Sequence, residues 1–88
     1  MKSIKCEHYD YIEIMCLYQY HVRLTLHSGN EIVGRFNNIV IVQGDDQNYE
    51  AICGYTTTLT HQTVILTDIK LIEVLSTNSL FTHLTLSE

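Results

Sequence analysis

The chain has 88 residues, 45% of them hydrophobic and 17% charged, a composition typical of one small folded domain spanning residues 1–88. Its net charge is −5 and only five residues are Lys or Arg, so sequence-independent nucleic-acid binding, which needs clustered cations, is not expected. A domain of this size also leaves little room for a deep enzyme pocket.

The N-terminal stretch MKSIKCEHYD lacks the apolar segment of a signal peptide. Elsewhere, too, no apolar run approaches the roughly 20 residues that a membrane helix needs. The cysteines are Cys6, Cys16 and Cys53, an odd number. We therefore expect reduced thiols in a cytoplasmic protein, with a disulfide as the less favoured case.

Residues 7–18 are predicted to form a short helix. At 3.6 residues per turn, one stripe of this helix is apolar and comprises Tyr9, Ile12, Met15 and Cys16. A second stripe carries the acids Glu7, Asp10 and Glu13. Carboxylates in the first turns suit the positive end of the helix dipole. The tyrosines and isoleucines of this segment would also tolerate a strand.

From Val22 onward, apolar and polar residues alternate as in half-buried strands. A turn at residues 28–30 joins the first two strands into a hairpin, and Gly34 suggests a bend or bulge in the second. The predicted strands are 22–27, 32–42, 49–53, 63–66, 69–75 and 80–86, with a polar loop at 43–48. One short helix followed by five to six antiparallel strands predicts a mainly β, strongly bent barrel or sandwich.

A metal site is the first chemical reading of the N-terminal segment. The side chains that could supply it are Cys6, His8, Cys16 and His21. Structural zinc sites use closely spaced Cys pairs and His pairs, and neither spacing occurs here. On a helix, Cys6 and Cys16 would lie about 15 Å apart along the axis. We therefore expect no metal and no cofactor, with Cys16 packing as a small apolar residue.

Catalysis is the second reading, because Asp10 and Glu13 could act as general acid and base if burial separated their pKa values. The sequence has no nucleophile elbow, phosphate-binding loop or HExxH pattern. We therefore do not expect an enzyme.

A binding face is the third reading. Tyr9 beside Asp10 and Glu13 would suit a basic protein partner, since tyrosine offers apolar area together with a polar hydroxyl. The alternative is a solvated acidic helix edge with Tyr9 anchored in the core, and the pattern alone favours this alternative.

The hairpin LTLHSGNEIVGRF, residues 24–36, resembles the first Sm motif. Sm-like proteins have an N-terminal helix on a bent five-stranded barrel, so the resemblance implies an Sm-like fold. The positions that hold RNA in Sm proteins are occupied here by Val40, Gly44 and the pair Ile65–Leu66. An Sm-like RNA-binding module is the alternative function.

The run CEHYDYIEIMC, residues 6–16, followed by the Leu-Thr-Leu strand at 24–26 and Gly29, resembles the bacterial Rho-binding antiterminator family, Rof. That family carries Cys-acid-x-Tyr-Asp-x-aliphatic-Glu-aliphatic-x-Cys at this spacing. The resemblance implies a protein that binds the N-terminal RNA-binding domain of the transcription termination factor Rho. It would compete with RNA there and inhibit Rho-dependent termination.

The resemblance also implies which residues contact Rho. These are Tyr9, Asp10 and Glu13, with Glu7 as peripheral support and Asp45 and Asp46 in the 43–48 loop as a possible second contact. Rho is then the expected partner, with no direct nucleic-acid or membrane binding. We expect a monomer; a subunit that pairs through exposed strand edges is a third class, and light scattering would detect it.

Overall fold

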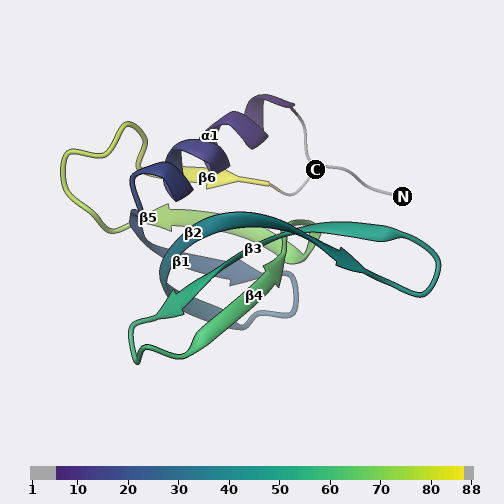
Figure 1. Ribbon diagram of the computed structural model, residues 1–88. Helices are drawn as coiled ribbons and strands as arrows, with labels where there is room; N and C mark the ends of the chain where they lie inside the picture. The colour runs from purple at the N-terminus through teal and green to yellow at the C-terminus, as the bar shows by residue number, and fades with distance from the viewer. Residues whose placement is uncertain (1–5, 87–88) are drawn as a thin grey trace.

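The computed structural model describes residues 6–86, with side chains from residue 8 onward. Within this part, α1 (Cys6–Leu17) precedes a six-stranded antiparallel sheet (Figure 1). The strands are β1 (His21–Leu26), β2 (Glu31–Gln43), β3 (Asn48–Thr56), β4 (His61–Ile65), β5 (Ile69–Val74) and β6 (His83–Thr85), with the 3₁₀ turn η1 (Leu66–Asp68) before β5. The predicted mainly β fold is confirmed. The strand order β4-β3-β2-β1-β5-β6 is compatible with the Sm-like arrangement. No described helix is long and apolar enough to cross a membrane.

The C-terminal end of α1 is closed by a backbone cap. Gln19 adopts a left-handed conformation with φ of 52°, which turns the chain out of the helix. The Tyr20 N–H then donates to the Met15 carbonyl at 3.1 Å and the Gln19 N–H donates to the Cys16 carbonyl at 3.3 Å. This pattern satisfies carbonyls that a helix end otherwise leaves unpaired, and it directs the buried Tyr20 toward the core. The helix therefore ends at Leu17.

Replacing Gln19 with Gly is expected to stabilise the protein by about 0.5–1 kcal/mol, because Gly adopts positive φ without the steric cost that a Cβ imposes. Gln19→Ala is the matched control, since it removes the side chain but keeps the Cβ. Urea unfolding measures both variants. Equal stability of the Gly and Ala variants would show that the backbone at Gln19 is not strained.

The core lies between α1 and the sheet. The helix contributes Ile12, Met15 and Cys16, and the strands and their connections contribute Val22, Leu24, Phe36, Ile52, Val64, Leu66, Ile69, Ile72, Leu84 and Leu86. Because the apolar stripe of α1 meets the sheet, the opposite edge of the helix faces solvent. This packing fixes which helix residues a partner can reach.

The longest strand, β2, is curved (Figure 1), and its pairing with β3 shifts register between Phe36 and Asn38. The bulge lies at Asn37, three residues after Gly34, so the prediction that Gly34 itself forms the bulge is wrong. A Cβ at Gly34 would collide with the Tyr55 carbonyl, and one at Gly54 would collide with the Arg35 carbonyl. The two glycines therefore allow β2 and β3 to approach closely.

The last predicted strand is shorter than expected. Residues 80–86 alternate in hydropathy, yet β6 contains only three residues. Phe81 instead packs edge-on against Tyr11 and Tyr20, with ring centroids 5.2 and 5.9 Å apart. Conversely, β3 continues past the predicted Cys53 to Thr56. The alternation of residues 80–86 does not reveal that Phe81 packs against α1. This packing explains why β6 begins only at His83.

Candidate protein-interaction surface

The exposed edge of α1 carries the acidic residues predicted from the sequence. Asp10 and Glu13 are exposed, and neither forms an ion pair with any residue in the described part of the chain. Ile12, Met15 and Cys16 are buried, which confirms the predicted apolar stripe. The two carboxylates are therefore available for an external partner. Glu7 belongs to the first helical turn, and its side chain lies outside the described residues.

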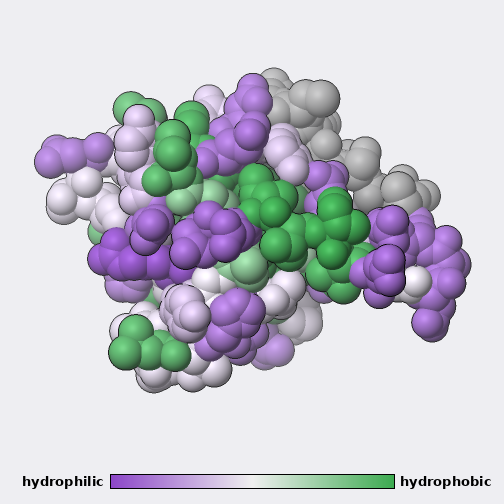
Figure 2. All heavy atoms as spheres, in the orientation of Figure 1, coloured by the Kyte–Doolittle hydropathy of each residue, from purple (hydrophilic) through white to green (hydrophobic). Residues whose placement is uncertain are grey.

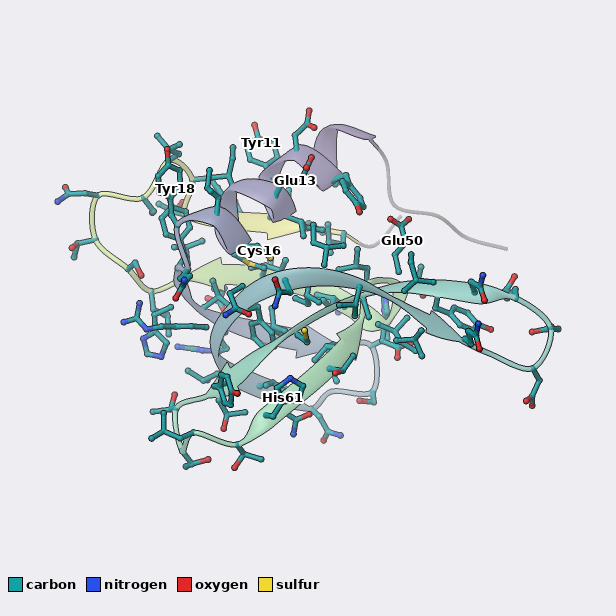
Figure 3. All side chains as sticks on the ribbon, viewed as in Figure 1. Tyr11, Glu13, Cys16, Tyr18, Glu50 and His61 are labelled. Carbon is teal, nitrogen blue, oxygen red and sulfur yellow. The ribbon has the colours of Figure 1, made fainter. Side chains whose placement is uncertain are left out.

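Tyr9 is half-buried and packs against the core beside this acidic edge. The pKa of Tyr9 is raised to about 12. Burial is the largest cause, followed by the neighbouring Glu50 carboxylate and then by Glu13, because all three disfavour a phenolate. The hydroxyl is protonated at neutral pH, and its proton is engaged in a hydrogen bond with the Glu50 carboxylate. Glu50 comes from β3, and Figure 3 shows it below the N-terminal end of α1, with Glu13 nearer the middle of the helix.

An exposed isoleucine lies next to Glu50. Ile41 of β2 pairs directly with Glu50 of β3, so their side chains emerge on the same face of the hairpin. Ile41 is 60% exposed. Figure 2 shows apolar residues gathered below the N-terminal end of α1 and over the β2–β3 hairpin, bordered by hydrophilic ones. We call the set Tyr9, Asp10, Glu13, Ile41 and Glu50 the helix–hairpin surface.

The sequence-based prediction missed Ile41 and Glu50. Glu50 joins this surface through its contact with Tyr9, and Ile41 joins it because the β2–β3 register pairs it with Glu50. Alternation within β3 marks Glu50 as exposed but does not say which element lies beside it. The register of a hairpin with a bulge is not readable from one sequence.

Asp45 and Asp46 are exposed at the tip of the β2–β3 hairpin, beyond the last pair Gln43–Asn48. Asp46 precedes the start of β3 by two residues and Glu50 by four, so at most about 13 Å of chain separates it from Glu50. The structure therefore places them on the same hairpin as the helix–hairpin surface but not within it. Their role as a second contact stays a prediction.

Titration of Tyr9 gives a pH-dependent prediction. Its pKa is about 12 in the folded protein against a usual 10.0, so the neutral form is favoured by folding. Its contribution to stability is fully present below pH 10 and is lost as pH rises from 10 to 12. Difference absorbance titration is expected to show a tyrosine transition near pH 12 in the protein that is absent from Tyr9→Phe. A Tyr9 transition near pH 10 would contradict the burial described above.

The cysteines show no metal-binding arrangement in the described part of the chain. No group of three or more His, Cys, Asp or Glu side chains between residues 8 and 86 could hold a metal ion. Cys16 and Cys53 are buried free thiols. Burial raises the pKa of Cys16 to about 11, so the thiol is protonated at neutral pH and is a poor metal ligand or nucleophile. The side chain of Cys6 lies outside the described residues.

The fold and the surface together define a small, mainly β domain with an acidic N-terminal helix. The model of one protein family, described as modulator of Rho-dependent transcription termination (ROF), matches residues 3–86. The chain therefore belongs to the ROF family. The resemblance drawn from residues 6–29 is confirmed.

A solved structure supports the same relationship. YaeO from Vibrio cholerae O395, described as bound to magnesium, superposes with a TM-score of 0.73 and 26% sequence identity. The alignment covers 90% of this chain and 97% of the YaeO chain. Proteins with curated descriptions give no match. The ROF family is described by an effect on transcription termination and not by a catalysed reaction.

Proposed function

We propose that this protein binds the N-terminal RNA-binding domain of Rho through the helix–hairpin surface. Occupying that domain would exclude RNA and reduce Rho-dependent termination. Membership of the ROF family supports the choice of Rho as the partner. The single structural observation that carries the proposal is the exposed carboxylate pair Asp10 and Glu13, which has no ion-pair partner among residues 8–86 and lies beside the half-buried Tyr9.

The physical chemistry of the two surfaces is complementary. A domain that holds RNA must present Lys and Arg to the phosphates, and a chain of net charge −5 is attracted to such a surface. Asp10 and Glu13 would accept charge-assisted hydrogen bonds from those cations. Tyr9 would contribute the face of its ring, and Ile41 would bury apolar area at the centre.

Salt dependence tests this electrostatic account. Purified protein is expected to bind full-length Rho most tightly at low salt, with affinity falling steadily as salt rises, because the Debye length shortens from about 30 Å at 0.01 M to about 8 Å at 0.15 M. Isothermal titration calorimetry across that range measures the effect. Affinity that is independent of salt would mean that the acidic edge does not carry binding.

The RNA-binding alternative is tested without Rho. Filter binding of short uridine- or adenine-rich RNA to the protein alone is expected to show no tight complex, since only five residues are cationic. Tight RNA binding would favour the Sm-like module instead. The proposed activity places the protein in the bacterial cytoplasm, where Rho acts on nascent transcripts, and needs only one copy of the chain.

A further inference from the structure

A second candidate site lies beyond the C-terminal end of α1. It is a pocket of about 350 Å³ between the start of β1, the bend of β2 and the end of β3. Its lining includes Gln19, His21, Arg35, Asn37, Tyr55 and Leu59, and no lining residue is acidic. None of these residues belongs to the helix–hairpin surface. Figure 3 shows Glu50 far from His61, whose ring contacts that of the pocket residue Tyr55.

One row of side chains crosses four neighbouring strands at this pocket. The sheet register pairs His21 of β1 with Arg35 of β2, Arg35 with Tyr55 of β3, and Tyr55 with His61 of β4. Directly paired residues project from the same face of a sheet, so these four side chains stand side by side. The row brings one permanent cation, two imidazoles and a phenol ring together in a protein that is acidic overall.

The members of the row are held in place by local contacts. Arg35 Nη1 donates to the Gln19 carbonyl at 3.0 Å, and its other N–H groups have no partner among the described residues. The rings of Tyr55 and His61 meet edge-on, with centroids 5.4 Å apart and planes at 77°. Tyr55 is nevertheless 51% exposed. The site thus offers an oriented cation beside an accessible aromatic ring.

Asn37 reaches the pocket because of the β2 bulge. The register shift between Phe36 and Asn38 takes Asn37 out of the regular pairing. Bulges often redirect a side chain in this way next to functional sites. The amide of Asn37 can both donate and accept hydrogen bonds. It therefore adds the kind of group that reads the polar edge of a planar ring.

The rim of the pocket contains a strained and exposed leucine. Leu59 has φ of 65° and is 82% exposed, an unfavourable combination of backbone and solvation. The β3–β4 turn holds it there: the Leu59 N–H donates to the Thr56 carbonyl at 2.8 Å, and the Thr60 N–H donates to the Thr56 hydroxyl at 3.2 Å. A rigid turn that presents an apolar side chain beside a pocket suits ligand contact.

We propose that this pocket binds a small ligand that joins a planar ring to an anionic group, with a nucleoside monophosphate as its representative. The ring stacks on Tyr55 against Leu59, with Asn37 at its edge, and the anion meets Arg35 beside His21. The volume is at the small end of the roughly 300–1,000 Å³ of ligand pockets, which suits a single nucleotide unit. This inference is independent of Rho binding.

NMR titration of the full chain tests the proposal. The probes are AMP and UMP, with adenosine, uridine and inorganic phosphate as fragments that lack one of the two features. A monophosphate is expected to give saturable shifts at Arg35, Tyr55 and Thr57, with each fragment binding at least tenfold more weakly. Overturning results are the absence of saturable shifts, shifts confined to other surfaces, or phosphate alone binding as well as the nucleotides.

Substitutions locate the site. Arg35→Gln and Tyr55→Ala are each expected to weaken nucleotide binding at least tenfold, and Arg35→Lys is expected to recover part of the loss. Arg23→Gln is the matched control, because it removes the same charge from β1 outside the pocket, where Arg23 lies 3.8 Å from Glu73. Amide spectra establish that each variant is folded. Equal weakening by Arg23→Gln and Arg35→Gln would overturn the assignment.

Discussion

Replacing Asp10 and Glu13 together with Lys is expected to abolish Rho binding and leave the fold intact. Both side chains are exposed and unpaired within the described residues, so the exchange costs little stability. Each charge-assisted hydrogen bond contributes roughly 1.5–3 kcal/mol, so losing two lowers affinity at least 100-fold, before repulsion between like charges is counted. Calorimetric titration with Rho and circular dichroism measure the two effects.

A control with the same change in net charge separates local contacts from the overall field. Glu31→Lys combined with Asp68→Lys alters two exposed acids outside the helix–hairpin surface. This double variant is expected to bind Rho within a few-fold of the unaltered protein. If both double variants lost affinity equally, net charge alone would explain binding and the proposed contact face would be wrong.

Replacing Ile12 with Ala is expected to destabilise the protein by about 2–5 kcal/mol, the usual cost of truncating a fully buried isoleucine. Ile12 is 0% exposed and anchors α1 on the sheet. Guanidinium unfolding measures the change. A loss below about 0.5 kcal/mol, the range of surface substitutions, would contradict the docking of the helix described above.

Ile41→Ala is the matched comparison, since it makes the same chemical change at a residue that is 60% exposed. Its stability is expected to change by less than about 0.5 kcal/mol. Its affinity for Rho is expected to fall severalfold, because Ile41 would be buried at the centre of the complex. The two isoleucines thus separate a residue that positions the surface from one that contacts the partner.

The helix and its two faces could be predicted because their signal is local. Tyr9, Ile12, Met15 and Cys16 recur with helical spacing, and the structure buries the last three and half-buries the first. Strands with alternating residues, such as β1, were predicted for the same reason. The family could be predicted because the run at residues 6–16 is contiguous in the sequence. The family model then matches residues 3–86.

Features that depend on register could not be predicted. Glu50 lies near Tyr9 through a contact between β3 and α1, and Ile41 lies beside Glu50 because β2 and β3 pair in that register. The row from His21 to His61 likewise draws one residue from each of four strands separated by as many as 40 positions. Gly34 suggests a bend or bulge from the sequence, whereas the register shift lies at Asn37 and Gly34 has a steric role against the Tyr55 carbonyl. The helix–hairpin surface, the row of four side chains and the role of Gly34 all depend on contacts between residues far apart in the sequence.

Competition for Rho between this protein and RNA tests the central claim most directly. Fluorescently labelled RNA bound to purified Rho is titrated with the protein and, in parallel, with the Asp10→Lys, Glu13→Lys double variant, and RNA release is followed by anisotropy. The protein is expected to displace RNA completely, with an apparent affinity that weakens in proportion to the RNA concentration, and the double variant is expected to displace none. RNA that remains bound to Rho at saturating protein, or equal displacement by the double variant, would contradict the account.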